Sequence, residues 1–250
     1  MPTNSSIVDN LREIHARIES ACVNSKREVS EVQLLLATKT VKPENIKVAL
    51  SNNERLIGEN KVQEVKEKYE ALLSVPHEKH FIGHLQSNKI KEVLRYGVTC
   101  IQSLDRLSLA EKLQKRLTFE NKHMNVFIQV NTSAEKSKFG VSPDNAISLI
   151  KQIAHFDRIH IKGLMTIGLF SADKEKVREC FQLLKQLQQA IISENISNVS
   201  MKELSMGMSG DLEIAIEEGA TIIRVGTAVF GERAYPDSYY WNENTNNIVQ

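Results

Sequence analysis

Eight short apolar segments alternate with amphipathic segments along the chain, and this repeat restricts the possible folds more than any other feature. The interval from Leu36 in the first segment to Ile223 in the last, divided by seven, is about 27 residues, a length typical of βα units. Runs such as VQLLLATKT are typical of parallel strands covered on both faces. The segments lie at 32–40, 56–58, 80–83, 98–103, 124–132, 158–168, 199–206 and 221–231. Eight units in 250 residues predict one (β/α)8 TIM barrel.

The segments between the strands carry helix signals. Residues 5–23 place Ile7, Leu11, Ile14, Ile18 and Cys22 on one stripe, which predicts a leading helix within residues 1–26. Further helices are predicted from Pro43, Val62, Ser87, Asp105 and Pro143, through 177–191 and over 211–219. A doubly wound open sheet is the alternative fold, but such sheets usually have fewer strands.

Composition narrows the class of protein and of partner. Hydrophobic residues make up 41% of the chain and charged residues 25%, which is ordinary for a folded globular protein. The net charge of +1 gives no reason to expect nucleic acid or a membrane as partner, so a small molecule is the default ligand. Three widely spaced cysteines with no CxxC pair predict a reducing compartment.

The chain shows no targeting or membrane-spanning segment. Its first 20 residues are too polar for a signal peptide, and no apolar run approaches the ~20 residues of a membrane span. We therefore expect a cytoplasmic protein with a single domain over 1–250, including a C-terminal tail at 232–250, and favour a monomer over a dimer.

The carboxyl ends of barrel strands form the active-site face, so Lys39 at the end of the first strand is the first residue of interest. Strand parity gives Lys39 the same face as Leu35 and Ala37, pointing into the barrel. Burial lowers the pKa of a lysine amine from ~10.4, and a neutral amine can attack an aldehyde to form a Schiff base. The alternative is an ammonium group that reaches solvent at the strand end.

Small and hydroxyl-bearing residues follow the last two strands. Gly207, Ser209 and Gly210 precede a predicted helix, and Gly226 and Thr227 follow the eighth strand. Small residues allow a backbone to approach closely, hydroxyls donate hydrogen bonds, and barrels commonly bind phosphate after strands seven and eight. The alternative is ordinary turn chemistry, with Ser209 or Asp211 as a helix N-cap. Taken together, the two loops favour phosphate.

An inward lysine opposite a phosphate site suggests either a phosphosugar, as in Schiff-base aldolases, or pyridoxal phosphate (PLP). Arg224 shares parity with Gly226 and would face inward, where it could meet a pyridine nitrogen. A guanidinium accepts no proton, so it would leave that nitrogen unprotonated and make the ring a poor electron sink. The alternative for Arg224 is an ion pair with a carboxylate of the barrel.

Six motifs, in order, carry a resemblance to a known family. The motifs are ATKT, GENKVQE (58–64), HFIGHLQSNK (80–89), GLMTIG (163–168), LSMGMSGD (204–211) and RVGTAVFG (224–231). On these motifs the chain resembles the pyridoxal phosphate homeostasis proteins of the YggS/PROSC type over nearly its whole length. Lys61 departs from the usual motif GENYVQE, since it replaces the tyrosine and adds a cation near the mouth of the site.

The resemblance implies a barrel of the alanine racemase N-terminal-domain type with PLP held as a Schiff base on Lys39. It implies phosphate binding by the 205–209 loop together with Gly226 and Thr227. The implied cofactor contacts are Lys39, Asn60 beside the cofactor, Met165 packing nearby, Ser205, Met208, Ser209, Arg224 near the ring nitrogen, Gly226 and Thr227.

The expected function depends on which features of the related racemases this sequence has and which it lacks. Racemases of the related fold carry a second domain and a tyrosine base, whereas the 19 residues after 231 cannot build such a domain. Tyr235, Tyr239, Tyr240 and Trp241 are therefore interpreted as packing or tail residues. We expect a protein of vitamin B6 homeostasis that holds PLP and supplies it to apo-enzymes, with no catalytic residues and at most weak racemase-like activity. The alternative is a PLP-dependent amino acid racemase or decarboxylase.

No metal site is expected. His80 and His84 would lie roughly 13 Å apart along a strand, too far apart to share one zinc ion. His84 is interpreted as a residue of the pocket rim, and Cys100 as a small core residue.

Overall fold

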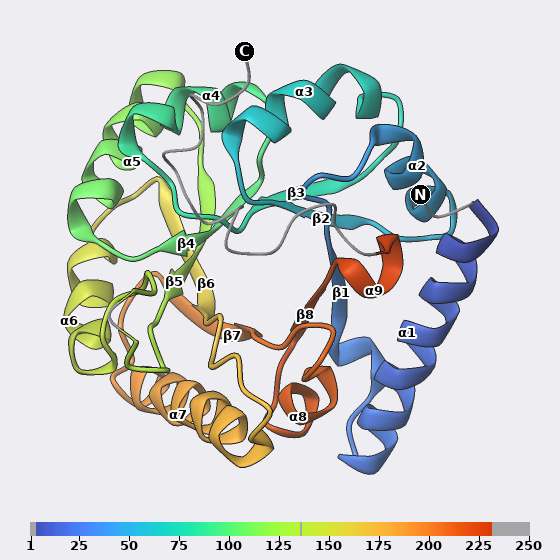
Figure 1. The fold of residues 1–250 in the computed structure, drawn as a ribbon. Coiled ribbons are helices and arrows are strands. Elements are labelled where there is room, and N and C mark those ends of the chain that lie inside the picture. The colour runs from blue at the N-terminus through green and yellow to red at the C-terminus, as the bar shows by residue number, and fades with distance from the viewer. Residues whose placement is uncertain (1–3, 136, 232–250) are drawn as a thin grey trace.

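Eight parallel strands close into a barrel in the order in which they follow along the chain, as Figure 1 shows for the computed structural model. The structure describes residues 4–135 and 137–231. The ring closes where Leu35 lies opposite Arg224 on the eighth strand. The strands are β1 (Gln33–Ala37), β2 (Leu56–Glu59), β3 (Glu78–Phe81), β4 (Cys100–Leu104), β5 (Met124–Gln129), β6 (Ile159–Met165), β7 (Val199–Ser205) and β8 (Ile222–Val225). The predicted barrel is confirmed, and the doubly wound alternative is wrong.

Helices surround the barrel, and a further helix precedes the first strand (Figure 1). The helices are α1 (Asn4–Asn24), α2 (Pro43–Ser51), α3 (Val62–Leu72), α4 (Ile90–Arg95), α5 (Leu107–Glu120), α6 (Pro143–Ile153), α7 (Lys174–Ser193), α8 (Leu212–Glu217) and α9 (Thr227–Phe230). The predicted apolar stripe of α1 is buried, and this helix packs against α2, α8 and α9. It therefore covers the side of the barrel where β8 meets β1.

Two apolar layers stabilise the fold. The larger layer fills the space between the barrel and its helices, because residues on the outer faces of the strands meet the helix stripes. A smaller cluster lies inside the barrel and consists of Leu35, Leu56, Cys100, Phe127, Met165 and Ile222. Cys100 is thus a core residue as predicted, and all three cysteines are buried free thiols.

The third strand begins earlier than its apolar pattern predicts, because a lysine takes part in it. We expected a strand at 80–83, whereas β3 begins at Glu78. Lys79 is only 5% exposed: its ammonium donates to the Tyr96 carbonyl at 3.1 Å and lies 5.3 Å from the Tyr69 ring. A long aliphatic stem with a satisfied charge can occupy a buried strand position. The strand also ends earlier than expected, at Phe81, so His84 lies in the loop that follows it.

Among the described residues, no helix is long and apolar enough to cross a membrane. The tail at 232–250, with Tyr235, Tyr239, Tyr240 and Trp241, lies outside the described residues.

Candidate functional site

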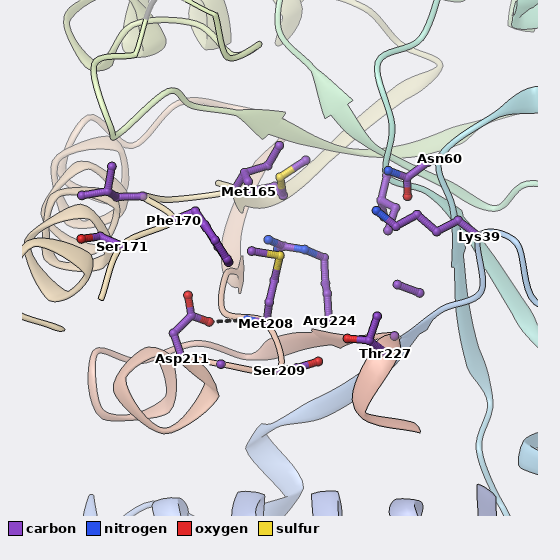
Figure 2. Close-up of a pocket in the computed structure, with 16 residues that line it drawn as sticks. Lys39, Asn60, Met165, Phe170, Ser171, Met208, Ser209, Asp211, Arg224 and Thr227 are labelled. Atoms are coloured by element: carbon purple, nitrogen blue, oxygen red, sulfur yellow. Dashed lines mark hydrogen bonds between the residues drawn. The ribbon is translucent and has the colours of Figure 1, made fainter. Parts of the chain in front are cut away.

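A pocket opens at the carboxyl ends of the strands, and eight of the nine predicted cofactor contacts line it (Figure 2). Residues from the loops after β1, β2, β3, β6, β7 and β8 line this pocket. The predicted residues that line it are Lys39, Asn60, Met165, Met208, Ser209, Arg224, Gly226 and Thr227. Ser205 does not line the pocket and is fully buried beneath it.

Lys39 lies two residues beyond the end of β1 and is 9% exposed. It lines the pocket together with Asn60 from the loop after β2, and Figure 2 shows both on the same wall. Ser209 and Thr227 lie on another part of the wall, on the loops after β7 and β8. A ligand in the pocket can therefore meet an amine at one end and hydroxyl groups at the other.

Two glycines let the chain approach closely in the loops after β7 and β8. Gly207 has a φ of +89°, and a Cβ on it would lie 2.4 Å from the Ala215 Cβ. A Cβ on Gly226 would meet the Ala37 carbonyl oxygen at 3.0 Å. Both positions therefore favour glycine, the first for its backbone conformation and the second for space.

The loop after β7 is held from two sides. The Met208 backbone N–H donates to Asp211 Oδ1, and burial raises the pKa of the Asp211 carboxyl. Arg17 of α1 donates from Nη2 to the Ser209 carbonyl at 2.9 Å and also binds both oxygens of Glu213. The leading helix thus fixes the loop that carries Ser209.

Arg224 points inward and is 6% exposed. Its Nη1 donates to Ser205 Oγ at 2.8 Å, and its Nη2 donates to the Thr166 carbonyl at 2.7 Å. Burial lowers the pKa of Arg224 to about 10, against the opposing influence of the Asp211 charge, so the guanidinium stays protonated at neutral pH. Hydrogen bonds to a hydroxyl and a carbonyl fix its orientation, and among residues 4–135 and 137–231 no carboxylate forms an ion pair with it.

A polar chain continues from Arg224 through the barrel. Ser205 Oγ donates to Gln102 Oε1 at 2.7 Å, and Gln102 Nε2 lies 2.8 Å from His80 Nδ1. Burial lowers the pKa of His80 to about 4, so its ring is neutral at pH 7 and Nδ1 accepts the hydrogen bond. Every donor in the chain therefore points from Arg224 towards His80.

A second pocket adjoins the first and shares Asn60 with it. Lys61 and His84 line this second pocket, so the expected extra cation lies beside the main pocket. The His84 ring stacks on Phe139 with centroids 3.8 Å apart and an interplanar angle of 18°.

Comparisons with known proteins identify the family of this chain. The family model of the alanine racemase N-terminal domain matches residues 7–234. Over 227 residues the chain is 43% identical to the pyridoxal phosphate homeostasis protein of Aquifex aeolicus. This match covers 91% of this chain and 98% of that protein. The chain belongs to the pyridoxal phosphate homeostasis protein family.

Solved structures of related proteins share the fold. PipY from Synechococcus elongatus PCC7942, in its structure with PLP bound, has a TM-score of 0.76 and 30% identity, covering 87% of this chain and 100% of that chain. Alanine racemase from Clostridium difficile 630 has a TM-score of 0.73 at 13% identity, and the match covers 92% of this chain and 58% of the racemase. At this low identity the likeness is one of fold alone. The family resemblance drawn from the six motifs is thus confirmed, as is the barrel type.

Sequence reasoning missed two groups of residues around the site. The loop after β6 contributes an apolar wall that includes Ile167, Leu169 and the 91% exposed Phe170. Gln102 and His80 support Arg224 from inside the barrel. The period-two pattern of β4 contained a signal for Gln102, since a polar residue inside an apolar run needs a partner.

Proposed function

We propose that this protein holds PLP on Lys39 and supplies it to PLP-dependent apo-enzymes, without substantial catalysis of its own. The observation that supports the proposal is that one pocket is lined by Lys39 and by two loops suited to binding a phosphate. The family of the chain supports the same ligand. The proposal includes a monomeric protein that acts in the cytoplasm.

The residues present fit PLP. Glycine at 207 and 226 keeps the loops after β7 and β8 close-packed, with Ser209 and Thr227 able to donate to phosphate oxygens. Met165 and Ile82 offer apolar contact for a ring, and Asn60 lies beside Lys39. The cofactor brings an aldehyde carbon, with which the Lys39 amine forms a Schiff base with loss of one water molecule.

Arg224 bears on whether the site favours catalysis by PLP or only the holding of PLP. In the proposed placement its guanidinium faces the ring nitrogen, and Ser205 and the Thr166 carbonyl hold it in that orientation. Because a guanidinium donates and cannot accept a proton, it keeps that nitrogen unprotonated. This weakens the electron withdrawal that amino acid racemisation and decarboxylation require.

One experiment tests the ligand and the attachment site. The purified protein is incubated with PLP, its absorption band is recorded, and borohydride reduction followed by peptide mass mapping locates the modified lysine. We expect the adduct on Lys39 and loss of the band in Lys39→Ala. An adduct on another lysine, or a band that survives in Lys39→Ala, would refute the assignment.

A second experiment separates a carrier from an enzyme. A carrier loses its absorption band as an added apo-enzyme gains activity, and it exchanges the α-proton of amino acids with solvent deuterium only slowly. Exchange in the ordinary enzyme range of ~1 to 1000 per second, abolished by Lys39→Ala, would instead establish a racemase-type enzyme.

A further inference from the structure

The backbone on both sides of Lys39 is tied to β2 and helix α3 by polar side chains, buried on the N-terminal side and more exposed on the C-terminal side. On the N-terminal side, Thr38 Oγ1 donates to Glu59 Oε1 at 2.6 Å, and the Thr38 carbonyl accepts from Lys68 Nζ at 2.7 Å. On the C-terminal side, the Thr40 backbone N–H donates to Glu64 Oε2 at 3.0 Å. Lys39 thus lies between two anchored residues.

The two anchors meet at one ammonium group. Lys68 Nζ lies 2.8 Å from Glu59 Oε1 and 3.3 Å from Glu64 Oε2, with the Lys68 and Glu59 side chains 8% and 2% exposed. A single buried cation therefore joins the carboxylate that binds Thr38 to the carboxylate that binds Thr40. Buried charges of this kind are strongly coupled, because removing one leaves the others uncompensated.

The second anchor acts on a backbone in an unfavourable conformation. Thr40 has a φ of +64°, in the left-handed region, which is costly for a β-branched residue. Such a conformation persists where surrounding contacts enforce it. The hydrogen bond from its N–H to Glu64 is one such contact, so loss of Glu64 should let the chain beyond Lys39 relax.

The charge of Glu59 in this network depends on pH near neutrality. Burial raises the pKa of Glu59 to about 7, while the charge of Lys68 opposes this rise and that of Glu64 adds to it. Lys79 of β3 also interacts electrostatically with Glu59. Glu59 Oε2 is buried without a hydrogen-bond partner in the described part of the chain, which suits a carboxyl that carries a proton part of the time.

We propose that Glu59, Glu64 and Lys68 form a positioning network that presents the Lys39 amine to the pocket and sets its reactivity. The proposal deepens the proposed function and rests on Lys39 being the attachment point. None of the three lines the main pocket, so they act through the backbone of Thr38 and Thr40.

Variants that cut one anchor at a time test the network. Glu64→Ala removes the acceptor for the Thr40 N–H, whereas Glu64→Gln keeps an oxygen in place. Thr38→Val removes the hydrogen bond from the Thr38 hydroxyl to Glu59 without loss of side-chain volume. This variant tests the network if Glu64→Ala fails to fold. Glu70→Ala, at an exposed position on the same helix, is the matched control.

Two measurements are made on folded protein. In the cofactor-free protein, trace labelling with acetic anhydride and peptide mass spectrometry gives the pH profile of Lys39 reactivity. In a separate assay, the growth of the absorption band gives the rate at which Lys39 captures PLP. Labelling needs no cofactor, so it tests the network even if the wild type captures no PLP and the proposed function fails.

We expect the labelling midpoint of Lys39 to move in Glu64→Ala and Thr38→Val. In Glu64→Ala, capture of PLP should slow about tenfold, the size expected for one lost hydrogen bond to a charged group. Glu70→Ala should stay close to wild type in both measurements, and Glu64→Gln, which keeps an acceptor for the Thr40 N–H but loses the charge, should change less than Glu64→Ala. Unchanged midpoints and capture rates in Glu64→Ala and Thr38→Val, or an equal shift in Glu70→Ala, would overturn the proposal.

Discussion

Replacing His80 with asparagine should change how the stability of the protein depends on pH. His80 lies inside the barrel, 7% exposed, with Nδ1 accepting a hydrogen bond from Gln102. Asparagine can place an oxygen near the position of Nδ1, so the variant keeps an acceptor for Gln102 while removing a titratable group.

The size and sign of the effect follow from the two pKa values of His80. Burial lowers the pKa in the folded state to about 4, from the ordinary value of 6.5 in the unfolded chain. Between these values the unfolded chain binds more protons, so the free energy of unfolding falls as the pH falls. At ~1.4 kcal/mol per pH unit, the loss from pH 6.5 to pH 4 amounts to about 3 kcal/mol. Above pH 6.5 the contribution is constant.

Urea unfolding at a series of pH values from 7.5 to 4.5 measures this loss. Wild type should lose about 2 to 3 kcal/mol more than His80→Asn over this range. Groups that titrate in both proteins cancel in the difference. His155→Asn, at an exposed position after α6, is the control for loss of one imidazole. If wild type and His80→Asn lose stability in parallel, the buried neutral histidine is not the cause.

Three further predictions concern other parts of the site. Burial raises the pKa of Glu59 in the folded state from 4.5 to about 7, so the folded state retains the proton and the free energy of unfolding falls as pH rises between these values. In urea unfolding, Glu59→Gln should flatten this decline, and an unchanged slope would refute the raised pKa. Thr227→Val should weaken PLP binding by ~1.5 to 3 kcal/mol but spare pyridoxal, and equal losses for the two ligands in a fluorescence titration would refute a phosphate contact. Arg17→Ala releases the Ser209 carbonyl from α1 and should reduce PLP affinity about fivefold, whereas Arg12→Ala on the exposed face of α1 should not.

The barrel and most of the pocket wall could be predicted because they follow from local patterns. Parallel strands buried on both faces leave apolar runs, and their regular spacing fixes the number of βα units. Lys39 followed from the parity of a single strand, and Gly207 and Gly226 from loop chemistry. Each of these inferences needs only residues that are neighbours in the sequence.

The polar interior could not be predicted, because its partners meet only when the barrel closes. His80, Gln102, Ser205 and Arg224 come from four different strands, and no sequence spacing relates them. Ser205 illustrates the difficulty. We predicted that it belongs to the loop 205–209 that binds phosphate. In the structure Ser205 is the last residue of β7, and its carbonyl accepts a strand hydrogen bond from the Thr166 N–H. Its side chain therefore remains inside the barrel.

Closure of the barrel also determines how Arg224 would act in the proposed placement of PLP. Although burial lowers its pKa, Arg224 stays protonated at pH 7, so it neither takes up nor releases a proton during binding. Ser205 passes its own hydrogen towards Gln102 and therefore accepts from Arg224, and the Thr166 carbonyl can only accept. These two partners leave Arg224 one role towards a ligand, that of a fixed donor. A pyridine nitrogen facing it would gain a hydrogen bond without gaining a proton, and tight binding with weak electron withdrawal is the property that a PLP carrier needs.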